Sequence, residues 1–243
     1  MNQLLQSFEV LKIGEEELAP GECDLGVLIP RAFVHDRLDE FADELKELNE
    51  IFEVFAEVAT GKRPNFRIKT ISSTDLSVLL EIAPIVGKLI VSALTDVIAV
   101  YKQIIDIKLG LKKLAETNVP QKALQHVEDH ANEKMNKEID TIVVKVLSQR
   151  YEGLDSGRVN ELKMALTIQV SKLADRVDRG FNIEVRMQQP ALTNEDVEPD
   201  AATKALVENY NEIKEASENL QFLKSEGPPI LHLTEVKNKH ETE

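Results

Sequence analysis

The chain has 243 residues, enough to bury a large core as one domain or as two small domains that share helices. Its hydrophobic fraction of 42% and charged fraction of 30% are ordinary for a soluble protein, and its net charge of −14 would repel phosphate backbones, which argues against a nucleic-acid partner. The single cysteine cannot form an internal disulfide and the amino terminus lacks the pattern of a secretory signal, so we expect a cytoplasmic protein.

Residues 1–83 are predicted to form an α+β front of the order β-β-α-β-β. Strands at residues 8–13 and 24–29 precede an amphipathic helix that we expect Asp36 to cap and Gly61 to end, with its acidic face in solvent. Residues 66–71 and 76–82 then alternate between apolar and polar side chains on either side of a polar cluster. That alternation predicts a hairpin.

The most apolar stretch, residues 84–116, predicts one long helix with Pro84 in its first turn. Its apolar residues recur in alternating steps of three and four, as in a coiled-coil seam, and its polar residues form a stripe on the other side. Such a helix is a core helix covered by the same chain, a seam shared with a second copy, or a membrane span. Because a membrane span would place Lys88 and Asp96 within hydrocarbon, we expect no membrane association.

Residues 84–189 are predicted to form a helical body. A second long helix, at about residues 120–150, is expected to fold back against the first, and a third helix follows that ends before Gly180. Residues 181–187 alternate cleanly and predict a strand that returns to the front sheet or its edge.

Residues 190–243 are expected to contain an acidic linker, an amphipathic helix that starts at Asp200, a possible edge strand at residues 230–233 and a partly disordered tail. The predicted fold is therefore α+β and helix-dominated. It consists of a small antiparallel or mixed sheet of about five strands packed against long antiparallel helices.

One candidate metal site lies on the second long helix. His126, His130 and Glu133 are spaced i, i+4 and i+7, so their side chains share one helix face, and two imidazoles with one carboxylate suit zinc or iron. The stretch HVEDH matches neither HExxH nor HxxEH, and it places no general base beside the metal. A metal-dependent hydrolase is therefore an alternative function, and solvent-exposed histidines are the simpler interpretation.

A small-anion-binding regulatory module is a further alternative, with Arg63, Arg67 and Lys69 as the binding residues. The sequence contains neither a P-loop nor G-x-G-x-x-G, which argues against a kinase, an ATPase or a nucleotide-dependent dehydrogenase. No cofactor is predicted. Cys23 has no adjoining cation to activate its thiol, so we expect it to be a packed apolar residue.

In the absence of a catalytic pattern, the favoured function is a non-enzymatic interaction or assembly subunit of a bacterial-type cytoplasmic system. The order of strands and helices and the FRIKTISSTD turn are similar in general appearance to bacterial cytoplasmic proteins, without a motif that implies an activity. We expect a homo-oligomer or a protein partner. The expected interaction seam on the long helix and the C-terminal helix comprises Val86, Ile90, Val97, Ile104, Leu111, Leu206, Tyr210 and Ile213.

Overall fold

The structure of the protein, a computed structural model, describes residues 18–72, 76–115, 121–191, 200–220 and 229–233; for residues 107–108, 111–115 and 121–127 it describes the backbone alone. The described elements in chain order are β1 (Cys23–Leu28), α2 (Leu38–Thr60), β2 (Arg67–Ser72), β3 (Ser77–Ile82), α3 (Pro84–Ala115), α4 (Gln121–Ser148), α5 (Ser156–Asp178), β4 (Asn182–Met187) and α6 (Ala201–Asn219). The predicted helix-dominated α+β fold is confirmed. Within these residues the sheet has four strands rather than about five, and the strand predicted at residues 8–13 lies outside them.

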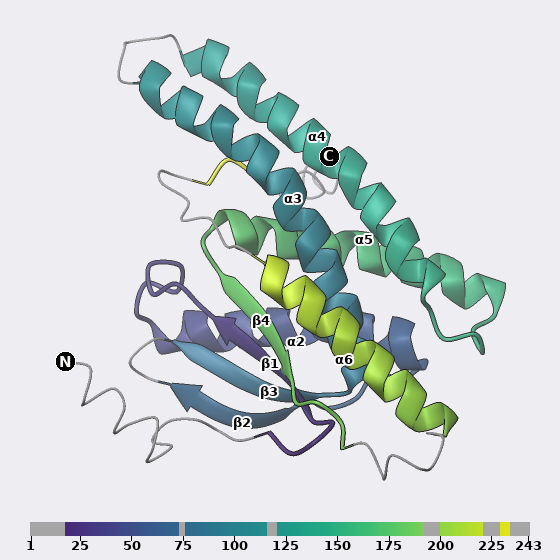
Figure 1. Ribbon diagram of the computed structural model, residues 1–243. Coiled ribbons are helices and arrows are strands. Elements are labelled where there is room, and N and C mark those ends of the chain that lie inside the picture. Colours follow the sequence, from purple (N-terminus) through teal and green to yellow (C-terminus); the bar gives the residue numbers. More distant parts are fainter. Residues whose placement is uncertain (1–17, 73–75, 116–120, 192–199, 221–228, 234–243) are drawn as a thin grey trace.

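The sheet is antiparallel, with the order β2-β3-β1-β4 (Figure 1). The predicted hairpin is confirmed as β2 and β3, with a shift in register between Ile68 and Thr70 that makes Lys69 the extra residue of a β-bulge. The predicted return strand is β4, which pairs along the whole of β1. Side chains of β1 alternate, so that Cys23 and Leu25 face the core and are at most 1% exposed.

α3 is the centre of the core. It contacts β1, β4 and each of the other four described helices, and α4 runs alongside it (Figure 1). Gly87 allows the helix to approach the sheet closely, because a Cβ at this position would lie 2.9 Å from both Cys23 Sγ and Val185 Cγ1. The close packing of the start of α3 on β1 and β4 thus requires a glycine at position 87.

The segment Pro84–Asp106 is long and apolar enough to cross a membrane, judged by length and composition alone. In the folded chain 61% of its apolar window is buried inside the protein. The sheet and the neighbouring helices therefore cover α3 in the way that a soluble protein covers its core helix.

A single cluster of buried apolar side chains links the three predicted segments. It includes Leu25 of the front, Val97 of the helical body and Ile213 of the C-terminal helix. Because these residues share one core, the front sheet and the helices depend on each other for stability.

Three local predictions have different outcomes. Gly61 ends α2 as predicted, with a left-handed φ of 73°. Asp36 does not cap this helix, because its own φ of 55° is incompatible with the extended backbone of an N-cap, and Arg37 occupies that position. Residues 230–233 form no edge strand, since their backbone is bound by side chains of α4 and α5.

Candidate functional site

The predicted interaction seam lies largely inside the protein. Val86, Ile90, Val97 and Ile104 of α3 are at most 1% exposed, and Ile213 of α6 is 2% exposed. Leu206 and Tyr210 of α6 are half-buried, whereas the side chain of Leu111 lies outside the described residues. In this conformation the five buried seam residues cannot contact a partner.

α6 covers part of the polar stripe of α3. Lys88 Nζ of α3 lies 2.8 Å from Glu212 Oε1 of α6, and α6 also contacts β4. The charged residues that would oppose a membrane span are thus used in contacts within the chain. Asp96 accepts from Lys145 of α4 at 2.6 Å.

The residues of the predicted metal site do not form a ligand set in the described part of the chain. His130 and Glu133 are exposed on α4, whereas Ala131 and Met135 of the same helix are fully buried. The side chain of His126 is outside the described residues. Among the described residues no group of three His, Cys, Asp or Glu side chains is close enough to hold a metal ion.

The predicted anion-binding cations are held apart by separate carboxylates. Arg63 pairs with Glu57 at 2.6 Å, Arg67 with Glu81 at 3.6 Å, and Lys69 with Asp24 at 2.9 Å. Desolvation alone would lower the pKa of Lys69, but Asp24 and the nearby Glu22 carboxylate raise it above its usual value. Each positive charge is already compensated, so the three residues do not form one cationic site.

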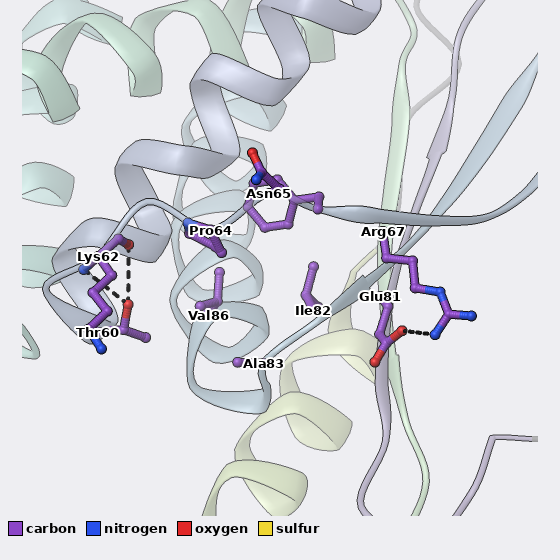
Figure 2. A pocket seen from close by; sticks show the side chains of 10 residues that line it. Thr60, Lys62, Pro64, Asn65, Arg67, Glu81, Ile82, Ala83 and Val86 are labelled. Atoms are coloured by element: carbon purple, nitrogen blue, oxygen red, sulfur yellow. Dashed lines mark hydrogen bonds and ion pairs between the residues drawn. The ribbon is translucent and has the colours of Figure 1, made fainter.

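An open pocket of about 530 Å³ lies where the end of α2, the β2–β3 pair and the start of α3 meet (Figure 2). Its lining residues are Thr60, Lys62, Pro64, Asn65, Phe66, Arg67, Glu81, Ile82, Ala83 and Val86. Figure 2 shows Lys62 and Arg67 on opposite sides, with Arg67 turned toward Glu81. The lining combines both signs of charge with an apolar floor, and two of its polar groups are engaged within the chain: Thr60 donates to Ala56 O and Glu81 pairs with Arg67.

Cys23 is the packed apolar residue that its sequence context predicts. It is 1% exposed, and desolvation, with a smaller effect from Asp24, raises the pKa of its thiol to about 12. Because only the thiolate is nucleophilic, folded protein is expected not to react with Ellman's reagent near pH 8, and to react fully after unfolding in guanidinium. Rapid reaction of the native protein would contradict this burial.

Two carboxylates on the predicted solvated face of α2 are buried, which corrects that prediction. Glu44 receives two hydrogen bonds from Arg176 of α5, of 3.0 and 2.9 Å, and both side chains are less than 10% exposed. Desolvation raises the pKa of Glu44 even though Arg176 acts in the opposite direction. Arg176 also lies 6.0 Å from the ring centroid of Phe33.

Glu57, which is also buried, forms a second charge pair between these helices, with a partly exposed arginine. It accepts from Arg63 at 2.6 Å and from Arg158 of α5 at 2.8 Å. Desolvation alone would raise the pKa of Glu57, but the two guanidinium groups lower it. Both buried glutamates therefore join α2 to α5, and neither is placed as an acid or base for a substrate.

The outer edge of the sheet carries the clearest exposed apolar pair. β2 is the end strand of the described sheet, and Ile68 and Ile71 pair with the inward-facing positions Leu80 and Val78 of β3. Ile68 is nevertheless 52% exposed and Ile71 49% exposed. We call this strand with these two side chains the β2 edge. The sequence predicts the strand but not its position at the end of the sheet.

The fold and the arrangement of these residues define an α+β protein whose buried charges serve packing. No protein-family model, curated protein or solved structure matches the chain.

Proposed function

We propose that the protein is a non-enzymatic assembly subunit that associates with a second copy of itself through the β2 edge. The observation that supports this proposal is the exposure of Ile68 and Ile71 on β2, one of the two end strands of the sheet within the described residues. Natural proteins usually protect such edges with charges, β-bulges, proline or a covering element, because an open edge pairs with other strands. β2 carries a bulge at Lys69, but Ile68 and Ile71 on either side of it are exposed, and these two aliphatic side chains form the proposed pairing surface.

An antiparallel pair of β2 strands would be self-complementary. A two-fold axis between residues 69 and 70 places Ile68 of each copy opposite Ile71 of the other, and the bulge at Lys69 keeps the two isoleucines of each strand on one face of the sheet. Such a contact is isologous and closes as a dimer. It also differs from the helical seam that the sequence favours, because the described part of that seam is buried within the chain.

The charges on β2 do not oppose this pairing. In this register Lys69 comes close to Lys69 of the second copy across the axis, whereas Arg67 lies opposite Ser72; Lys69 is paired with Asp24 of its own chain and Arg67 with Glu81. The repulsion between the two strands is therefore reduced by compensation within each copy. The proposal includes a cytoplasmic location, which the single buried cysteine supports.

The test is sedimentation velocity on the parent protein and on an Ile68→Lys/Ile71→Lys variant. The parent is expected to be a dimer. The variant is expected to be monomeric at the same concentration, with a dimer dissociation constant at least about tenfold higher, because two further lysines on the edge oppose pairing. Met164→Lys is the matched control, since Met164 is 72% exposed on α5 and far along the chain from β2. A monomeric parent, or a variant that dimerises like the control, would refute the proposal.

A further inference from the structure

The short segment Pro229–Leu233 is held in the core without belonging to a helix or strand. Ile230, Leu231 and Leu233 are 3%, 0% and 9% exposed, and the segment appears in yellow near α3 in Figure 1. It is separated from α6 by residues 221–228. A segment this short contributes apolar side chains to the core but has no strand neighbour to satisfy its backbone, so its polar groups need other partners.

Asp178, at the end of α5, satisfies two consecutive backbone N–H groups of the segment. Its Oδ2 accepts from Ile230 N at 2.6 Å and from Leu231 N at 2.8 Å. Its Oδ1 accepts from the hydroxyl of Tyr101 on α3 at 2.7 Å. Asp178 is 1% exposed, so this carboxylate makes its hydrogen bonds to groups inside the protein rather than to solvent.

Asn132 of α4 also forms hydrogen bonds with the backbone of this segment. Its Nδ2 donates to Ile230 O at 3.0 Å, and its Oδ1 accepts from His232 N at 2.7 Å. A side-chain amide that donates to one residue and accepts from the next but one mimics the neighbouring strand that recognises an extended peptide. Side chains of two helices, α4 and α5, thus bind four backbone groups of the five-residue segment, and Tyr101 of α3 donates to Asp178 from behind.

We propose that Asn132 and Asp178, with Tyr101 behind Asp178, form a binding site for an extended apolar peptide, with residues 229–233 as its tethered and exchangeable ligand. The polar contacts to the segment come from side chains of α4 and α5, and Tyr101 of α3 orients Asp178. This site is separate from the β2 edge, and the inference does not depend on the proposed self-association.

The contacts specify the ligand. It needs two adjacent aliphatic residues that both carry a backbone N–H, then a residue whose N–H reaches Asn132, and then a further aliphatic residue. Proline is therefore excluded at positions 230, 231 and 232 but tolerated at 229, where the chain has Pro229.

The experiment uses the full chain with a protease site placed within residues 221–228, before and after cleavage. The probe is a fluorescein-labelled peptide spanning residues 227–236, followed by fluorescence anisotropy. Cleaved protein is expected to exchange its own segment for the probe, whereas intact protein is not, because a tethered ligand has a high effective concentration. The Leu231→Pro peptide is expected to lose binding, and the Pro229→Ala peptide to retain it.

Asn132→Ala is expected to weaken probe binding about fivefold to tenfold, since one side chain serves two backbone groups. Asn219→Ala is the matched control: Asn132 and Asn219 both donate to the carbonyl four residues earlier, at 2.8 Å, and in the described structure only Asn132 reaches the segment. If cleaved protein keeps its fragment without exchange, or unfolds after cleavage, the segment is a fixed part of the core and the proposal is wrong. Equal binding by the Asn132→Ala variant and its control would also refute it.

Discussion

Replacing Arg176 with methionine is expected to lower the free energy of unfolding by about 3–5 kcal/mol, because it leaves a charged or newly protonated Glu44 buried without its partner. The side chains of Arg176 and Glu44 are only 8% and 4% exposed, so water cannot replace the lost bidentate contact. Urea denaturation measures the change directly.

The control for this variant is Arg186→Met, since Arg186 is 63% exposed and pairs with Glu184 on the surface. Its expected cost is below about 1 kcal/mol. The double variant Glu44→Leu/Arg176→Met is expected to recover most of the loss, because it removes both charges. Similar losses for Arg176→Met and Arg186→Met would show that the pair between α2 and α5 is not buried in solution.

The loss in Arg176→Met is also expected to depend on pH. Glu44 has a raised pKa in the folded protein, so the folded state binds its proton more tightly than the unfolded state does, and stability falls as pH rises from the ordinary pKa of a glutamate carboxyl toward that of Glu44 in the folded protein. Removing Arg176 raises that pKa further. The difference from the parent is therefore expected to be smaller in acid than at neutral pH, and an increase toward acid would contradict this assignment.

Replacing Gly87 with alanine is expected to lower the free energy of unfolding by about 1–3 kcal/mol, although alanine normally favours a helix. The new methyl group would lie 2.9 Å from Cys23 Sγ and Val185 Cγ1 and 3.2 Å from Ile82 Cδ1, so α3 would have to move away from the sheet. Guanidinium denaturation of the variant measures the cost.

Gly110 in the same helix supplies the control, because a Cβ there would meet no atom within 4 Å. Gly110→Ala is expected to stabilise the protein by up to about 1 kcal/mol, the ordinary gain from alanine in a helix. If both variants were stabilised equally, the close contact between α3 and the sheet would not exist in solution.

The periodic parts of the sequence predict the fold well because their pattern repeats over many residues. The three-and-four spacing of α3 predicts its length, and the alternation in residues 181–187 predicts β4 and its return to the sheet. Glu44 illustrates where such reasoning fails. Its partner Arg176 is 132 residues away, so a local pattern of acidic residues predicts a solvated face where the fold buries a charge pair.

The candidate sites depend even more on distant contacts. The spacing of His130 and Glu133 shows that they share a helix face, but only the packing of α4 shows that this face points outward. The apolar residues at 230–233 indicate burial, yet the partners that replace a strand neighbour are Asn132 and Asp178, far earlier in the chain. Which strand forms the sheet edge is likewise set by the pairing of the whole sheet.

Backbone hydrogen exchange of β2 at increasing protein concentration tests the proposed assembly most directly. If two copies pair through this strand, the amides of residues 67–72 become more protected as the concentration rises in the parent and in Met164→Lys, but not in Ile68→Lys/Ile71→Lys. Exchange that is independent of concentration would contradict the account, whether it is fast because the edge stays open or slow because the edge is covered within one chain.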